Sequence, residues 1–160
     1  MSEHAPQPVT APRRTTRQVV VGGLPIGGDA PVRVQSMTTT VTGDLLTTGQ
    51  QIMELASAGA ELVRVTVNDD EAAEALPLLV QGSNVPLVAD IHYQHELALK
   101  SIEAGVAKLR INPGNIGSRD KVEPVVKAAR DAGVPRRVGV NHGRPHHRPP
   151  APSEPAPARA

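Results

Sequence analysis

The sequence predicts an α/β fold: a partial TIM-type (β/α) barrel of about five parallel strands and four helices, with an N-terminal hairpin. Runs of Val, Ile and Leu begin near residues 32, 61, 85, 107 and 136, and helix-forming stretches separate them. Polar residues lie at the end of nearly every run. No Gly-x-Gly-x-x-Gly turn follows the first predicted strand. This pattern favours a barrel over an open doubly wound sheet. A complete barrel takes roughly 250 residues, so residues 17–142 predict about half of one.

The N-terminal region divides into a lead-in and a hairpin. Residues 1–16 are polar and contain three prolines, which predicts a mobile segment. Short apolar runs at 19–21 and 24–26, each followed by a pair of glycines, predict a small hairpin that caps neighbouring structure. The first strand of the main sheet is then expected at 32–36.

Four helix-forming stretches follow, and three of them run into a glycine, which suits the end of a helix. Asn68 and Ser118 are the predicted N-caps of the second and fourth helices. Pro77 and Pro124 predict a kink or a late start in those two helices, because proline lacks the N–H group that a helix needs. The predicted helices span residues 45–58, 69–81, 95–104 and 120–132.

The C-terminal segment 143–160 differs in composition from everything before it. It carries six prolines and no aliphatic residue larger than Ala. Such a segment cannot pack a core, so the sequence predicts a disordered tail.

Composition excludes several classes of function. A net charge of +1 gives no bulk attraction for nucleic acid, although local clusters can be strongly positive. The absence of Cys removes disulfides, thiolate nucleophiles and cysteine-ligated clusters from anything the chain does alone. No run approaches the roughly 18 apolar residues of a membrane span. The N-terminus also lacks the apolar core of a signal peptide, so we expect a cytoplasmic protein that contacts no membrane.

Charged and amide side chains recur near the C-terminal ends of the strands, often two positions apart. Side chains at i and i+2 point to the same face of a sheet, and burying a guanidinium or carboxylate without a partner is costly. Repetition on successive strands therefore predicts one shared polar site. Its candidate members are Arg64, Asp90, His92, Arg110, Asn112, Arg137 and Asn141.

The three arginines of this set predict an anion site, because planar, permanently charged guanidinium groups suit phosphate or diphosphate oxygens. In segment 109–117, Arg110, Asn112 and backbone N–H groups at a helix start converge as donors. An ordinary turn, with Arg110 in a structural ion pair, is the alternative. Pairing with Glu61 or Asp90 would explain one arginine more easily than three.

Asp90 and His92 form a second constellation. They can hold a hydroxyl, relay a proton, or satisfy each other and a neighbouring arginine, and the residues alone leave these alternatives open. A metal site that adds His95 is not expected, because the turn after His92 gives no fixed facing geometry. We therefore predict no metal ligands in this chain.

Five segments, in order between about residues 14 and 141, resemble a known family. They are Val-Gln-Ser-Met-Thr at 34–38, Leu-Val-Arg-Val at 62–65, Val-Pro-Leu-Val-Ala-Asp-Ile-His at 85–92, Leu-Arg-Ile-Asn-Pro-Gly-Asn-Ile-Gly at 109–117 and Val-Gly-Val-Asn at 138–141. They resemble the N-terminal barrel of 4-hydroxy-3-methylbut-2-enyl diphosphate synthase, the flavodoxin- or ferredoxin-dependent enzyme of the non-mevalonate isoprenoid pathway. The third and fourth segments together are highly specific.

The resemblance implies a barrel that binds 2-C-methyl-D-erythritol 2,4-cyclodiphosphate, in a family expected to form homodimers. It also implies a separate domain, whose three cysteines and one glutamate hold the 4Fe-4S cluster that delivers two electrons for ring opening and loss of water. By motif match, Arg64, Arg110 and Arg137 would bind phosphate oxygens. Asn112 and Asn141 would orient the substrate. Asp90 and His92 would line its polyol side as the catalytic pair.

After Asn141 the sequence departs from the family pattern. The family continues with several hundred ordered residues, whereas His142-Gly143-Arg144 leads here into the tail. We hypothesise a change of reading frame in a GC-rich gene, or a truncated reading frame. This fragment would then be inactive alone, because the cluster domain is absent.

A second hypothesis is a non-catalytic half-barrel that binds a phosphate ligand and self-associates through its sheet edges. A third is a different barrel enzyme that acts on a phosphorylated or pterin-like substrate, for which the chain offers no evident catalytic apparatus.

Overall fold

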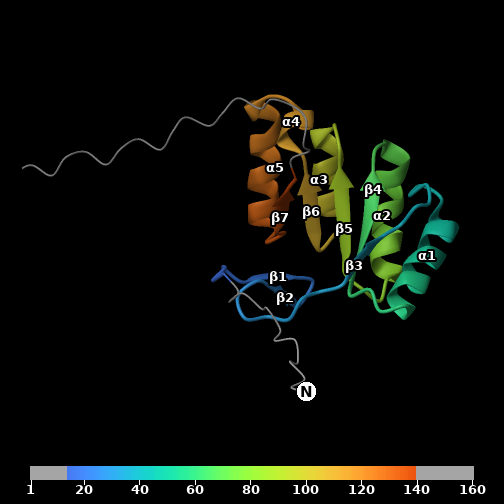
Figure 1. Ribbon diagram of the computed structural model, residues 1–160. Helices are drawn as coiled ribbons and strands as arrows, with labels where there is room; N and C mark the ends of the chain where they lie inside the picture. The colour runs from blue at the N-terminus through green and yellow to red at the C-terminus, as the bar shows by residue number, and fades with distance from the viewer. Residues whose placement is uncertain (1–13, 140–160) are drawn as a thin grey trace, which may run out of the picture.

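The computed structural model describes residues 14–139, which form a two-stranded hairpin, a five-stranded sheet and helices (Figure 1). The elements in chain order are β1 (Val19–Val21), β2 (Leu24–Ile26), β3 (Gln35–Met37), α1 (Leu45–Ser57), β4 (Leu62–Val67), α2 (Asp70–Gly82), β5 (Leu87–Ile91), α3 (His95–Glu103), β6 (Lys108–Ile111), α4 (Pro113–Ile116), α5 (Arg119–Asp131) and β7 (Arg136–Val138).

The main sheet is parallel throughout and its strands follow chain order, β3-β4-β5-β6-β7. Right-handed crossovers between neighbouring parallel strands place every connecting helix on the same face. The helices α1, α2, α3 and α5 accordingly line one side of the sheet (Figure 1). This arrangement confirms the predicted portion of a (β/α) barrel, with five parallel strands, four long helices and an N-terminal hairpin.

The hydrophobic core lies between the sheet and these helices. Along β4, Val63, Val65 and Val67 are fully buried, whereas Arg64 and Thr66, which alternate with them, are partly exposed. The period of two sends the valines to the helix-covered face and the polar residues to the opposite face. We call that opposite face of the sheet the inner face.

The hairpin covers the N-terminal end of the inner face, which confirms that it caps neighbouring structure. Val21 packs with Leu62 and Val88 in a small second core, joined by Leu24 and Ile26. In Figure 1 the hairpin lies below the sheet, and the arrowheads of the strands point away from it. The hairpin therefore forms a floor, and the carboxyl ends of the strands form the opposite rim.

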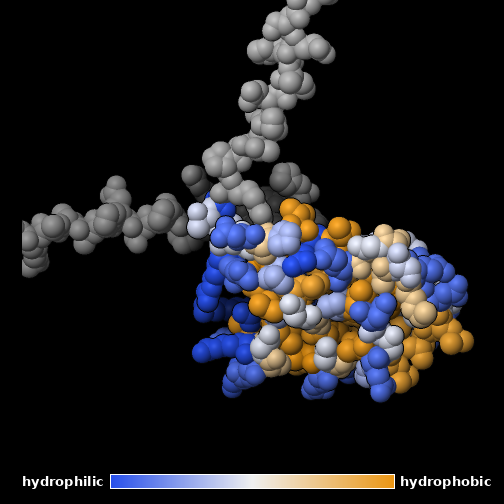
Figure 2. Space-filling model, turned by 90° about the horizontal axis from the view of Figure 1, so that it is seen from below, coloured by the Kyte–Doolittle hydropathy of each residue, from blue (hydrophilic) through white to orange (hydrophobic). Residues whose placement is uncertain are grey.

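Apolar side chains are exposed where α1 and α2 flank a groove of about 440 Å³. Leu46, Met53 and Leu78 are 84%, 59% and 56% exposed. Figure 2 shows hydrophobic side chains at the right-hand end of the molecule, the side on which α1 lies in Figure 1. None of the described helices combines the length and apolar character that crossing a membrane would require.

Some predicted helix boundaries need correction. The N-cap of α2 is Asp69 and not Asn68, because the extended backbone at Asp69 lets its carboxylate accept the N–H of Ala72 at 2.8 Å. Ser118 is the N-cap of α5, but its side chain makes no capping hydrogen bond.

A late start, one of the two effects predicted for the helix prolines, does not occur. Pro77 and Pro124 lie inside α2 and α5, which begin several residues earlier, so neither proline delays the start of its helix. The four-residue helix α4 was not predicted at all.

The first sheet strand begins later than predicted, at Gln35 instead of residue 32. Val32 is 83% exposed, and the N–H of Val34 donates to the carboxylate of Glu61 at 2.9 Å instead of to a neighbouring strand. The predicted tail at 143–160, most of the predicted lead-in and Asn141 lie outside the described residues, so those expectations remain predictions.

We predict that Gly22→Ala destabilises the protein by about 2–3 kcal/mol, the sum of left-handed strain and overpacking. Gly22 has a φ of +55°, and an added Cβ would lie 2.4 Å from Pro86. Gly23→Ala is the matched control, because Gly23 also has a positive φ but faces open space. Urea denaturation measures both. Equal losses would show that the hairpin is not docked against Pro86.

Candidate functional site

The candidate site is a layer of polar side chains across the inner face, one from each of four neighbouring strands. Thr66 on β4 is in register with Asp90 on β5, Asp90 with Arg110 on β6, and Arg110 with Arg137 on β7. Because the strands are parallel and unstaggered here, these four side chains leave the sheet side by side. The prediction that the strand-end residues share one face is therefore confirmed for this layer.

Asp90 is the centre of the layer and is completely buried. Its Oδ1 accepts a hydrogen bond from Arg110 Nη1 at 2.9 Å, and its Oδ2 lies 2.9 Å from Arg64 Nη2. One carboxylate thus holds two guanidinium groups from the strands on either side of it. Glu61, the other acid considered, pairs with Arg33 instead, at 2.7 Å.

The ion pairs leave hydrogen-bonding capacity in both arginines. The side chains of Arg64 and Arg110 remain 25% and 14% exposed. Arg64 Nε is buried and has no hydrogen-bond acceptor among the described residues. Asp90 Oδ2 is likewise buried without a hydrogen-bond donor among these residues. A buried polar atom without a partner costs free energy, and Arg64 Nε retains the capacity to donate to a further oxygen.

His92 lies at the edge of this cluster. Its Nε2 is 3.5 Å from Asp90 Oδ2, which is longer than a good hydrogen bond, and its side chain is 33% exposed. His95, which pairs with Glu96 at 3.0 Å, takes no part. The structure therefore places His92 at the edge of the site, partly exposed.

Asn112 directly follows β6 and is buried, two positions beyond Arg110. Its carbonyl oxygen accepts the N–H groups of Asn115 and Ile116, at 3.0 and 3.2 Å, and so opens α4. These two backbone N–H groups are therefore already engaged, and the predicted role of the helix start near Ser118 in anion binding stays a prediction.

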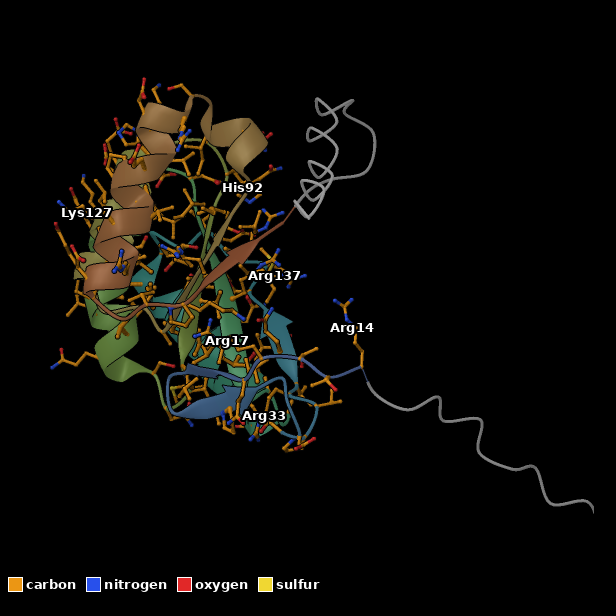
Figure 3. All side chains as sticks on the ribbon, turned by 90° about the vertical axis from the view of Figure 1, so that its left-hand side faces the viewer. Arg14, Arg17, Arg33, His92, Lys127 and Arg137 are labelled. Atoms are coloured by element: carbon orange, nitrogen blue, oxygen red, sulfur yellow. The ribbon has the colours of Figure 1, made fainter. Side chains whose placement is uncertain are left out.

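Arg137 completes the predicted arginines and behaves differently from the other two. It is exposed on β7 and forms no ion pair with any described carboxylate. Figure 3 shows Arg137 on the sheet, on the opposite side of the molecule from the helix that carries Lys127. The next inner-face position after Arg137 is Gly139, just beyond the end of β7, where an added Cβ would lie 2.9 Å from Arg110 Nε. The side chain of Arg110 therefore rests against β7, beside Arg137.

Lys108 is the site residue that the sequence reasoning missed. It precedes Arg110 by two positions on β6, so it shares the inner face, one layer nearer the hairpin. Its ammonium group donates to Gln35 Oε1 at 3.3 Å. Burial lowers the pKa of Lys108 below its ordinary value, and the positive charges of Arg137 and Arg64 lower it further. The period of two, applied from Arg110, would have found it.

Comparison with known proteins gives the family. Residues 16–148 match the GcpE TIM-barrel domain. The chain belongs to the GcpE family.

Curated members of this family are similar over most of this chain. The chain is 58% identical over 131 residues to a 4-hydroxy-3-methylbut-2-en-1-yl diphosphate synthase (flavodoxin) from Maridesulfovibrio salexigens. The aligned region covers 82% of this chain and 37% of that protein. Proteins of the same name from Pseudomonas paraeruginosa and Geobacillus kaustophilus are 54% and 58% identical, over 89% and 82% of this chain. The chain spans 38% and 35% of their lengths. It therefore spans little more than a third of the GcpE relatives it matches.

Solved structures support the fold. A Yersinia pestis dihydropteroate synthase superposes with a TM-score of 0.52 at 21% identity, over 74% of this chain and 44% of that one. A Xanthomonas albilineans dihydropteroate synthase gives 0.58 at 17% identity, over 81% and 52%. At these identities the likeness concerns the barrel architecture alone.

We predict that Asp90→Asn destabilises this GcpE domain by about 3 kcal/mol, because it leaves two partly buried guanidinium groups without their counter-charge. Asp70→Asn is the matched control, since Asp70 forms an exposed pair with Lys100 and its loss should be immeasurable. Thermal and urea denaturation report both changes. Equal stability of the two variants would show that Asp90 does not hold the arginines.

The lowered pKa of Lys108 predicts a pH dependence of stability. Below its folded-state pKa, Lys108 is charged in both the folded and unfolded states, and its burial costs stability in full. As pH rises from that pKa towards 10.5, the folded state loses the proton first, so the free energy of unfolding rises. Urea denaturation of the native chain and of Lys108→Met, repeated as the pH rises towards 10.5, should show this relative gain. If the difference in free energy of unfolding between the native chain and Lys108→Met does not change with pH, this prediction is wrong.

Proposed function

We propose that this chain supplies the substrate-binding portion of a 4-hydroxy-3-methylbut-2-en-1-yl diphosphate synthase. That enzyme carries out the reductive ring opening and dehydration of 2-C-methyl-D-erythritol 2,4-cyclodiphosphate. The names of the GcpE relatives support the assignment. The observation that carries it is the buried Asp90, which holds Arg64 and Arg110 side by side on the inner face.

Two oriented guanidinium groups are suited to a diphosphate. Each is planar, permanently charged and able to donate two parallel hydrogen bonds. Asp90 neutralises only one of the two positive charges and fixes both side chains before the ligand arrives. Arg137, in register beside Arg110, adds a third guanidinium group. A cyclic diphosphate carries the complementary charge and oxygen geometry.

The structure supports different roles for the proposed catalytic pair. Asp90 is completely buried and both of its oxygens face arginines, so we assign it to positioning of the phosphate-binding groups. His92 is accessible at the edge of the cluster, so we assign it to the polyol side of the substrate. Asn112 would orient the substrate from the end of β6, and Asn141 is proposed for the same task on family resemblance.

The residues of this chain do not fit the 4Fe-4S cluster that the family resemblance implies. The chain has no Cys, and residues 14–139 contain no group of three or more His, Asp or Glu side chains that could hold a metal. We therefore assign no electron-transfer step to this chain and expect no reductive turnover from it alone. The complete system, as we propose it, is cytoplasmic and homodimeric and takes electrons from flavodoxin or ferredoxin.

A second candidate is a non-catalytic half-barrel that binds a phosphate ligand and self-associates. The observation that favours it is the sheet order, in which β3 and β7 each pair on one side only among the described strands. Exposed strand edges readily pair with another chain. A discrete dimer that binds the cyclodiphosphate would favour this candidate, and light scattering measures its mass.

We predict that the chain binds 2-C-methyl-D-erythritol 2,4-cyclodiphosphate and that Arg137→Met weakens binding about 10- to 100-fold, the loss of one charge-assisted phosphate contact. Arg137 forms no described ion pair, so its replacement should leave the fold intact. Arg130→Met, on the exposed side of α5, is the control of equal charge change. Calorimetry measures the affinities. Equal affinity of the two variants would remove Arg137 from the site.

A further inference from the structure

A hollow of about 360 Å³ lies on the inner face, between the sheet and the segment that follows the hairpin. Gln35 and Leu62 line it from β3 and β4, Lys108 from β6 and Arg137 from β7. Its volume falls within the range of small-ligand pockets. Lys108 lies two residues, or about 7 Å, closer to the hairpin than Arg110. The hollow therefore lies beneath Arg110 and at the level of Arg64, which is in register with Lys108 through Val88.

The charges around the hollow are not balanced. Arg33, which also lines it, is neutralised by Glu61 at 2.7 Å. Lys108 and Arg137 form no ion pair with any carboxylate of residues 14–139. The inner face thus carries four cations, Arg64, Lys108, Arg110 and Arg137, against the single carboxylate of Asp90.

The positive charge of Lys108 is energetically unfavourable in this position unless a negative group lies beside it. It is half-buried, and its one described hydrogen bond is a long one to the neutral amide of Gln35. The charges of Arg137 and Arg64 act on it repulsively. An oxyanion in the hollow would replace the lost hydration of Lys108 and relieve the repulsion.

We infer that this hollow is an anion subsite, in which Lys108 and Arg137 together receive one phosphate-type oxyanion. The inference deepens the proposed function and rests on it, because Arg137 borders both the hollow and Arg110, its neighbour in register. A diphosphate can then place one phosphate against Arg64 and Arg110 and the other against Lys108. The subsite selects for doubly phosphorylated ligands over singly phosphorylated ones.

Calorimetric titration of the full chain with inorganic pyrophosphate and with inorganic phosphate tests the inference. Lys108→Met is expected to weaken pyrophosphate binding about tenfold, equivalent to about 1.4 kcal/mol. It should leave phosphate binding at Arg64 and Arg110 nearly unchanged. Lys108→Arg, which restores the charge, should recover most of the affinity. Lys127→Met is the matched control, because Lys127 is exposed on α5 and lies away from Arg137 in Figure 3.

The outcomes separate the subsite from the proposed function. Loss of pyrophosphate affinity in Arg110→Lys but not in Lys108→Met would overturn the subsite and leave the proposed function standing. Loss of pyrophosphate affinity in Lys108→Met but not in Arg110→Lys would support the subsite and remove Arg64 and Arg110 from phosphate binding. Equal tenfold losses of phosphate and pyrophosphate in Lys108→Met would overturn the selectivity. Failure of the native chain to bind pyrophosphate would overturn the subsite outright.

Discussion

The structure depends on one buried carboxylate that lies between two guanidinium groups. Asp90 has no exposure, and its two oxygens face Arg64 on β4 and Arg110 on β6. An isolated charge in that position would be prohibitively costly, whereas a charge paired on both sides is tolerated. The three central strands are therefore joined by backbone hydrogen bonds and also by an ionic bridge on their inner face. The bridge leaves one net positive charge on that face, and the proposed anion binding rests on it.

The same sheet serves two purposes because its side chains alternate. The valines of β4 face the helices and supply the hydrophobic core, while Arg64 and Thr66 face the interior of the partial barrel. The hairpin closes the lower end of that interior with Val21 against Leu62 and Val88. Polar groups are thus confined to a band between an apolar floor and the strand ends. The proposed ligand site lies in the same band.

Much of this could be predicted from the sequence, because the signals are local. Strand spacing, glycines after helices and the alternation of polar with aliphatic residues gave the parallel sheet, the hairpin and the shared face of Arg64, Asp90 and Arg110. The sequence did not predict the N-cap of α2 or the start of β3 correctly, because neighbouring residues compete for these positions. Asn68 and Asp69 can both cap a helix, and only the backbone conformation selects Asp69. The start of β3 depends on Glu61, a residue 26 positions beyond Gln35.

Lys108 was missed for a different reason. Lysine at the start of a strand is ordinarily solvated, and its burial here comes from the hairpin floor and from Gln35, neither of which its local sequence specifies. Which arginines pair with Asp90 also depended on register across three strands.

The docked hairpin has a consequence for the order of folding. Val21 meets partners that lie 41 and 67 residues further along the chain, at Leu62 and Val88. Contacts of such long sequence separation are entropically slow to close, and they form only after the strands that receive them are in place. We therefore expect the floor to assemble after the sheet and to open before it. Entry to the interior from below is accordingly a matter of local opening of two short strands, while the ionic bridge above remains intact.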